Sequence, residues 1–194
     1  MKRAFVILSF VLLASVAKAS TVDFNSFTPT NTVLTTLSTG GLTFAESSGD
    51  MYVWDSSAPN SNGTPGLIYA FQDYVAITAT GGGAFTLDSL DATISFYDTN
   101  PSDTLTLKGL YSGGGSILDT LTLGQGLETY DLAGFSDVTE VDVSALTSGT
   151  GYWLIDNVNY NGGPVVPEPG TFLLLGSGLV GLAGMVRRKI GLRA

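Results

Sequence analysis

The central part of the chain, residues 20–166, contains no stretch that keeps apolar side chains at the 3.6-residue spacing of an amphipathic helix. Its apolar residues fall in short runs instead, and Thr104–Lys108 (Thr-Leu-Thr-Leu-Lys) alternates strictly between polar and apolar residues, as expected of a strand with one buried face. Glycine, asparagine, serine and aspartate interrupt the runs at short intervals. This pattern predicts an all-β domain.

We expect roughly ten strands, because short runs bounded by turn residues recur along the whole segment. Many short strands of this kind are typical of a two-sheet antiparallel β-sandwich; a jelly roll is the preferred topology and a smaller barrel is the alternative. The glycine-rich segments 112–116 and 81–83 are predicted to be hairpin loops, because glycine adopts positive φ without penalty. The predicted strands lie near residues 22–24, 42–45, 51–54, 67–71, 74–80, 84–90, 92–98, 104–111, 116–123, 138–143 and 152–160.

The chain contains neither cysteine nor histidine. This composition excludes catalytic triads that need histidine, cysteine nucleophiles, and transition-metal sites built on histidine or cysteine. Only pairs of Asp and Glu side chains could support hydrolysis, as they do in glycosidases. No motif selects such a pair, so we expect a protein that is not an enzyme.

Charge is distributed very unevenly. Sixteen of the seventeen acidic residues lie in the segment 20–166 against a single basic residue, Lys108, which corresponds to a formal net charge of −15 for this segment. Such a surface cannot neutralise phosphates, so nucleic acid and anionic lipid headgroups are excluded as partners. The charge favours solubility and divalent cations, although an acidic surface that only keeps a secreted protein dispersed explains it equally well.

The N-terminus has the three parts of a secretory signal peptide. Met1–Arg3 is basic, Ala4–Leu13 is apolar, and Ala17 and Ala19 form a small-x-small cleavage site before Ser20. We therefore expect residues 1–19 to be removed during export by the general secretion machinery. The exported domain must fold without disulfides.

A second apolar segment lies near the C-terminus. Thr171–Val186 holds no charged residue and is followed directly by Arg187, Arg188 and Lys189. As a helix, this run rises about 24 Å, which is short of a hydrocarbon core of about 30 Å, but the basic side chains can extend to the interface. The sequence predicts a single transmembrane helix with a cytoplasmic C-terminus; a buried core helix is the alternative.

These segments predict the organisation of the whole chain. It comprises a signal peptide at 1–19, a β-sandwich domain at 20–163, a Pro/Gly linker at 164–170, a transmembrane helix at 171–186 and a basic cytoplasmic tail at 187–194. The two prolines of the linker disfavour helical continuation and hold it extended.

The order of the C-terminal parts resembles the PEP-CTERM sorting signal of Gram-negative bacteria. Its residues here are Val166, Pro167, Glu168, Pro169 and Gly170, followed by the apolar run and the basic stop. The resemblance implies processing at or near this motif by exosortase, a membrane-embedded transpeptidase-like enzyme. It also implies transit through the inner membrane to the cell surface or the extracellular space, in a bacterium that makes exopolysaccharide or biofilm.

A calcium site is suggested by the ends of the central domain. Asp156 shares the strand phase of Leu154, Val158 and Tyr160, and a carboxylate that faces the core with them is costly unless it is paired. A hard cation with oxygen ligands would pair it. The alternatives are that a β-bulge turns Asp156 outward, or that backbone amides satisfy it.

The early Val-Asp-Phe and the late Ile-Asp-Asn-Val resemble carbohydrate-binding-module jelly rolls, in which the terminal strands lie side by side and share a structural calcium. The resemblance makes Asp23, Asn25 and Asp156 the candidate ligands.

Together, these observations predict an exported, non-catalytic surface or extracellular-matrix protein that associates with glycan or exopolysaccharide. Two alternatives stay open. One is a calcium-assisted glycan hydrolase, which needs two carboxylates in an open cleft. The other is an ice-interacting protein, for which the paired Thr-x-Thr rows at 104/106, 120/122 and 78/80 would have to form one flat exposed face.

Overall fold

The computed structural model describes residues 19–29, 32–55, 60–70, 73–95, 103–145 and 152–162, and these residues form strands and turns without a helix. Every strand pairing is antiparallel. The strands are β1 Ala19–Val22, β2 Thr36–Thr39, β3 Leu42–Glu46, β4 Asp50–Trp54, β5 Gly66–Ala70, β6 Tyr74–Ala79, β7 Phe85–Ile94, β8 Asp103–Tyr111, β9 Ser116–Leu123, β10 Glu128–Asp131, β11 Val138–Ala145 and β12 Trp153–Gly162.

Most of the predicted strands are present, and the differences have local causes. The range predicted at 84–90 and the start of the range predicted at 92–98 belong to one long strand, β7, within which polar residues disturb the alternation. Residues 96–98 lie outside the described residues. The sequence did not predict β2 and β10, which are only four residues long. Leu37 is the single buried apolar side chain of β2, and β10 has none, so neither strand carries a clear period-two pattern.

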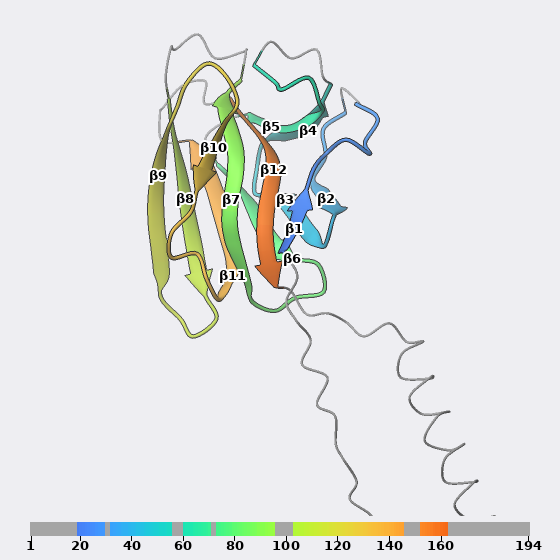
Figure 1. Cartoon of the computed structure of the whole chain (residues 1–194). Coiled ribbons are helices and arrows are strands. Elements are labelled where there is room, and N and C mark those ends of the chain that lie inside the picture. The colour runs from blue at the N-terminus through green and yellow to red at the C-terminus, as the bar shows by residue number, and fades with distance from the viewer. Residues whose placement is uncertain are drawn as a thin grey trace, which may run out of the picture. The chain divides into compact units, whose positions relative to one another are not determined.

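The twelve strands form one hydrogen-bonded sheet that curls into two layers. One layer has the order β9-β8-β11-β6-β3-β2 and the other the order β10-β7-β12-β5-β4, with β1 beside the second half of β12. A single residue pair, Val138 with Phe85, joins the layers through β11 and β7. In Figure 1, β7, β10 and β12 lie in front of β8 and β11. The predicted all-β antiparallel class is confirmed.

Side chains from both layers fill one hydrophobic core. Alternation explains which residues enter it: Leu105 and Leu107 of β8 and Val141 and Val143 of β11 are fully buried, whereas their sequence neighbours point to the outer face. Trp153 packs its ring against Tyr69 with 5.5 Å between the ring centroids. The largest fully buried side chains are Trp153, Tyr69, Phe24, Phe44, Phe85 and Phe135.

The two glycine-rich loops have different roles. Segment 112–116 joins β8 to β9 as predicted, and Gly114 and Gly115 have φ values of 88° and 87°. The hairpin predicted at Gly81–Gly83 is wrong. All three glycines have positive φ, but β6 pairs with β3 and β11 while β7 pairs with β10 and β12. This loop therefore carries the chain from one layer to the other.

The chain divides into two compact units, Met1–Pro164 and Val165–Ala194. The predicted signal-peptide helix and the predicted transmembrane segment 171–186 lie outside the described residues, except that β1 begins at Ala19, next to the predicted cleavage site. Within the described part of the chain, no helix has the length and apolar character needed to cross a membrane.

Candidate functional site

The outer face of the layer β9-β8-β11-β6-β3-β2 brings polar and charged side chains together. Strand alternation places serine and threonine hydroxyls, two acids and a lysine on it, while the other side of each strand enters the core. We call this surface the hydroxyl–acid face. Its residues are Thr36 and Ser38 (β2), Thr43 and Ala45 (β3), Tyr74, Ala76 and Thr78 (β6), Glu140, Asp142 and Ser144 (β11), Thr104, Thr106 and Lys108 (β8), and Leu118, Thr120 and Thr122 (β9).

Asp142 lies near the middle of this face. Strand register places it directly opposite Lys108 of β8 on one side and Ala76 of β6 on the other. Glu140 lies two residues earlier on the same strand and therefore on the same face. One carboxylate oxygen of Asp142, Oδ1, is buried and has no hydrogen-bond partner among the described residues. A buried oxygen without a donor is costly, which makes Asp142 the least satisfied acid of the face.

The positions of Asp142, Glu140 and Lys108 explain the pKa of Asp142. The pKa of Asp142 is raised from 3.8 to about 6, first because burial disfavours its charged form, and then because of the charge of Glu140 and a hydrogen bond with it. Lys108 acts in the opposite direction and lowers this pKa, but it does not cancel the increase. Asp142 therefore changes its protonation state near pH 6.

The predicted threonine rows do share one face. Thr104 is directly opposite Thr122, and Thr106 is directly opposite Thr120. However, Thr106 is only 9% exposed, and its Oγ1 is a second buried oxygen without a partner in the described structure. An ice-ordering array needs every row accessible to water, so the burial of Thr106 disfavours that alternative.

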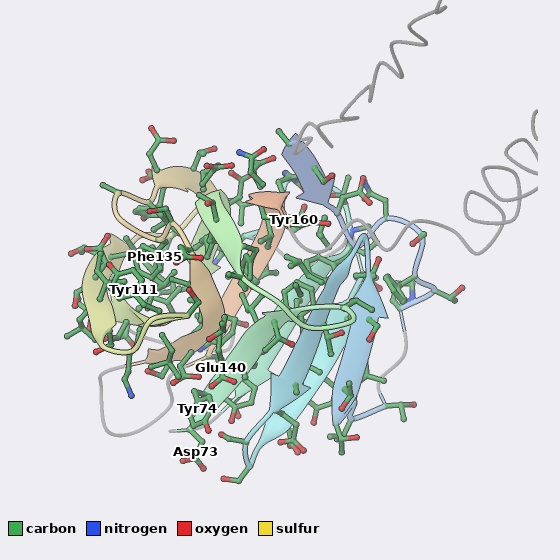
Figure 2. The ribbon with its side chains drawn as sticks, turned by 90° about the horizontal axis from the view of Figure 1, so that it is seen from below. Asp73, Tyr74, Tyr111, Phe135, Glu140 and Tyr160 are labelled. Atoms are coloured by element: carbon green, nitrogen blue, oxygen red, sulfur yellow. The ribbon has the colours of Figure 1, made fainter. Side chains whose placement is uncertain are left out.

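One aromatic side chain is accessible on the hydroxyl–acid face. Tyr74 is 39% exposed and lies opposite Ser144, in the row of residues next to Asp142. In Figure 2, Tyr74 and Glu140 lie towards the same outer margin of the domain, away from core side chains such as Phe135. Ala76 and Ala45 are opposite each other on β6 and β3, and their short side chains do not project from the sheet beside Tyr74.

Asp156, the predicted calcium ligand, lies on the outer side of the other layer. Trp153, Ile155 and Val158 all enter the main core, which means that the alternation of β12 shifts by one residue between Ile155 and Val158. The cause is a bulge at Asn157, whose φ of 45° is unusual for a residue other than glycine. An unbroken alternation would have put Asp156 on the same face as Val158 and Tyr160. The bulge puts it on the opposite, outer face, which was the alternative named from the sequence.

Asp156 is nevertheless buried, with 1% of its surface exposed, because the loop between β4 and β5 covers it. Its Oδ2 accepts hydrogen bonds from Asn62 Nδ2 at 3.2 Å and Thr64 Oγ1 at 3.0 Å, and its Oδ1 accepts one from the Asn157 amide at 2.8 Å. Burial raises its pKa; these three donors act in the opposite direction, and the facing Asp91 raises it further. A backbone amide thus contributes to satisfying the carboxylate, as one of the sequence alternatives anticipated.

The terminal strands do lie side by side, since β1 pairs with β12 over Ala19–Val22. Asp23 and Asn25 follow β1 and are exposed, and the Asn25 side-chain amide donates to Asp23 Oδ2 at 3.1 Å. Their hydrogen bonds join them to each other, whereas Asp156 is bonded to the β4–β5 loop and to Asn157. The described residues include no group of three or more acidic side chains placed to hold a metal ion. The calcium site stays a prediction.

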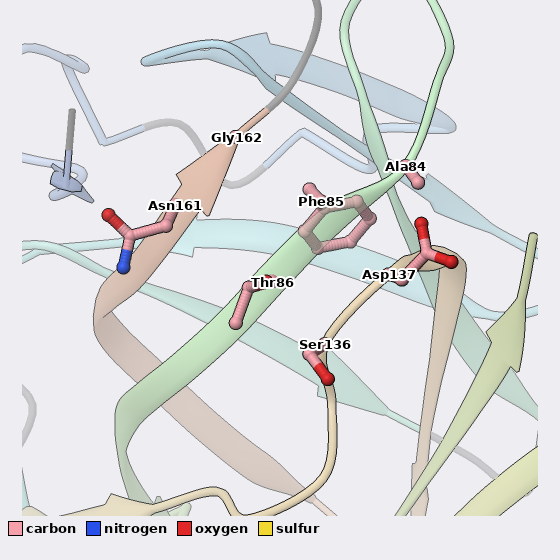
Figure 3. Close-up of a pocket in the computed structure, with 7 residues that line it drawn as sticks. All are labelled: Ala84, Phe85, Thr86, Ser136, Asp137, Asn161 and Gly162. Atoms are coloured by element: carbon pink, nitrogen blue, oxygen red, sulfur yellow. The ribbon is translucent and has the colours of Figure 1, made fainter. Parts of the chain in front are cut away.

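A pocket of about 350 Å³ lies where β12 ends and β7 begins (Figure 3). Asp137 is the only acidic side chain among its lining residues, and it accepts a hydrogen bond from Ser112 at 2.6 Å. A glycosidase needs two carboxylates across its cleft, so this pocket does not have the machinery of one. The lining residues are Ala84, Phe85, Thr86, Ser136, Asp137, Asn161 and Gly162.

Comparison with known proteins bears on the C-terminal segment first. Residues 165–189 match the PEP-CTERM protein-sorting motif. The resemblance seen in the sequence is thereby confirmed, and the motif implies an exported protein that exosortase sorts through the membrane towards the cell surface. No curated protein matches the sequence.

Similar solved structures include carbohydrate-binding modules. One family 29 module is 14% identical and covers 79% of this chain and 99% of its own, with a TM-score of 0.47. A mutant family 29 module is 12% identical and covers 75% of this chain and 86% of its own, with a TM-score of 0.48. An exo-β-agarase is 10% identical and covers 75% of this chain but 26% of its own, also with a TM-score of 0.48. Scores below 0.5 at such low identity do not establish a shared ligand or function.

The sequence singled out Thr106 only as part of the threonine rows, and it did not single out Asp142 or Glu140 as site residues. A usable signal was present, because Val-Asp-Val at 141–143 alternates as strongly as the threonine rows and would have placed Glu140 and Asp142 on one outer face. The position of Asp142 opposite Lys108 and Ala76 depends on the pairing of β11 with β8 and β6, which the sequence does not specify.

Proposed function

We propose that this chain is an exported, exosortase-sorted protein of the cell surface or extracellular matrix whose β domain associates with extracellular polysaccharide without catalysing a reaction. The proposed organisation is the one expected from the sequence: a cleaved signal peptide, the β domain, the sorting motif, a transient membrane segment and a basic tail. The sorting motif at 165–189 supports the export and the partnership with exosortase. The observation that carries the glycan association is the accessible ring of Tyr74 on an outer sheet face rich in hydroxyls.

The hydroxyl–acid face has the groups that sugars use. Carboxylates and hydroxyls exchange hydrogen bonds with sugar hydroxyls, and an accessible aromatic ring packs against the apolar side of a sugar ring. Ser38, Thr43 and Thr80 already form a chain of hydroxyl contacts at 2.9 and 3.0 Å, and Tyr74 offers the ring. An extended polysaccharide could lie across the strands beside Tyr74, over the short side chains of Ala76 and Ala45.

The arrangement supports binding better than hydrolysis. Glu140 and Asp142 lie two residues apart on one strand, whereas a glycosidase places its carboxyl groups on either side of the scissile bond. The charge of −15 over residues 20–166 argues against nucleic acid as a partner. Calcium bound at Asp23, Asn25 and Asp156 would act on the stability of the terminal strands and would not touch the hydroxyl–acid face.

The test is polysaccharide binding by the exported form, whose intact mass should show a C-terminus at or near Pro167–Pro169. Replacing Tyr74 with alanine removes the proposed stacking surface, so retardation in a native gel that contains polysaccharide should weaken by about tenfold. Tyr52→Ala, on β4 of the other layer, is the matched control and should bind as the wild type does. Equal binding by Tyr74→Ala and the wild type, or no retardation by any polysaccharide, would contradict the proposal.

A further inference from the structure

Two asparagines of this chain are followed directly by glycine, in the pairs Asn62-Gly63 and Asn161-Gly162. Asparagine before glycine is prone to lose its side-chain amide, because a residue without a side chain lets its backbone nitrogen reach the amide carbon of the asparagine. The nitrogen attacks that carbon and closes a five-membered ring. The backbone has to bend for this attack, so the surroundings of each pair decide whether it reacts.

The two pairs lie in contrasting surroundings. Asn161 belongs to β12 and is opposite Thr86 of β7 on one side and Ala19 of β1 on the other, so its backbone is held between two strands. Asn62 and Gly63 lie in the β4–β5 loop, where both are exposed. A Cβ added at Gly63 would meet no atom within 4 Å. Only Asn62 therefore has room to close the ring without opening the sheet.

The hydrogen bonds of Asn62 activate its side-chain amide. Its Oδ1 accepts a hydrogen bond from the Thr64 amide at 3.0 Å and a second one from the Thr64 hydroxyl. Donors at this oxygen stabilise the negative charge that develops on it when the Gly63 nitrogen attacks. The Gly63 N–H donates to Ser61 Oγ at 3.3 Å, which is longer than a usual N–H···O bond, so the attacking nitrogen is weakly held.

We propose that Asn62 is a site of spontaneous deamidation and that its product opens the β4–β5 loop over Asp156. The Gly63 nitrogen bonds to Asn62 Cγ and gives its proton to solvent, while the bond from Cγ to Nδ2 breaks and the nitrogen leaves as ammonia with a proton from solvent. Water then opens the ring at either carbonyl, which leaves aspartate or isoaspartate at position 62. Water is the only co-reactant. This inference goes beyond the proposed glycan association and does not depend on it.

The product cannot keep the contact that Asn62 makes with Asp156. In the unreacted loop, Asn62 Nδ2 donates to Asp156 Oδ2 at 3.2 Å. A carboxylate at position 62 has no N–H to donate, and it adds a negative charge beside a carboxylate that already faces Asp91. Asp156 is 1% exposed, so water does not screen this repulsion until the loop moves. The loop therefore covers Asp156 in newly exported molecules and moves away from it in aged ones.

The first experiment follows both Asn-Gly pairs within the same molecule. The exported form is incubated at mildly alkaline pH, where the backbone nitrogen attacks most readily, and samples are digested and mapped by mass spectrometry. The exchange of NH2 for OH changes the peptide mass, and separate aspartate and isoaspartate peptides identify the ring intermediate. We expect Asn62 to react at least about tenfold faster than Asn161, whose reaction requires the strands to open. A rate at Asn62 no higher than that at Asn161 would overturn the inference.

The second experiment tests the loop. Asn62→Asp carries one of the two products from the start, and Ser116→Asp adds the same charge at an exposed site on β9 of the other layer. Amide hydrogen exchange of residues 60–66 should be about tenfold faster in Asn62→Asp and within about twofold of the wild type in Ser116→Asp. The incubated wild type, once converted at position 62, should show the same acceleration. Wild-type exchange in both converted forms, or equal acceleration in the two variants, contradicts the opening of the loop.

Discussion

Asp142 and Asp156 lie on the outer faces of the two layers, and burial raises the pKa of each, yet their surroundings differ completely. Asp156 is 1% exposed and accepts hydrogen bonds from Asn62, Thr64 and the Asn157 amide. Asp142 is half-buried, has one oxygen without a partner, and lies beside a second acid. A raised pKa alone therefore does not distinguish a carboxylate that hydrogen-bond donors satisfy from one with an unpartnered oxygen; the hydrogen-bond partners do.

The largest expected effect concerns Asp156. Asp156→Ala leaves the three donors around it without an acceptor, so the free energy of unfolding should fall by about 3 kcal/mol. Urea unfolding of the exported form measures this value. Asp156→Asn retains an acceptor oxygen and should lose about 1 kcal/mol or less. Equal losses in the two variants would show that the charge, and not the acceptor, is what the loop requires.

Calcium would sharpen the contrast between the two aspartates. The calcium hypothesis predicts that an ion at Asp23, Asn25 and Asp156, supplied at a hundred times its dissociation constant, adds about 2.7 kcal/mol to the stability of the wild type. Asp156→Asn should show a much smaller increase, and Asp142→Asn should respond as the wild type does. Identical melting temperatures in calcium and in chelator would end the hypothesis.

The smallest effect concerns Asp142 and pH. Its folded-state pKa of about 6 lies above the ordinary value of 3.8, so the stabilising contribution is complete below pH 3.8 and is lost as the pH rises through 6. Because the group is largely solvent-screened, we expect the loss to be about 1 kcal/mol. Asp142→Asn should equal the wild type near pH 4 and exceed it by that amount near pH 7 in urea unfolding. A stability difference that does not change with pH contradicts the unbalanced-pair interpretation.

The contrast between the two aspartates also shows how far the sequence could predict the site. Alternation at 104–108 and at 116–123 was sufficient to predict β8 and β9 and to place the threonines on one face. For Asp156, the pattern left open whether an unbroken period of two turns the carboxylate inward or a β-bulge turns it outward, and the structure has the bulge. The bulge at Asn157 depends on pairing with β7, whose own register also shifts in this region.

Glycine positions illustrate the same limit. The segments 81–83 and 112–116 each contain three consecutive glycines, of which three and two respectively have positive φ, and both were predicted to be hairpins. Only the second connects paired strands; the first crosses between layers. Local chemistry determines that the chain turns at each place, but the partner strands determine where it goes after the turn.

The sequence by itself determined the all-β class, most strand positions, the charge of −15 over residues 20–166 and the C-terminal sorting motif, because each depends on residue type and spacing along the chain. Only the tertiary structure decided that Asp142, Lys108 and Thr106 share one face and that the β4–β5 loop covers Asp156. Those arrangements arise from pairings between strands distant in sequence. The physical reason is that a period of two specifies which residues share a side of one strand, whereas the register between strands, set by bulges and core packing, specifies which side chains meet.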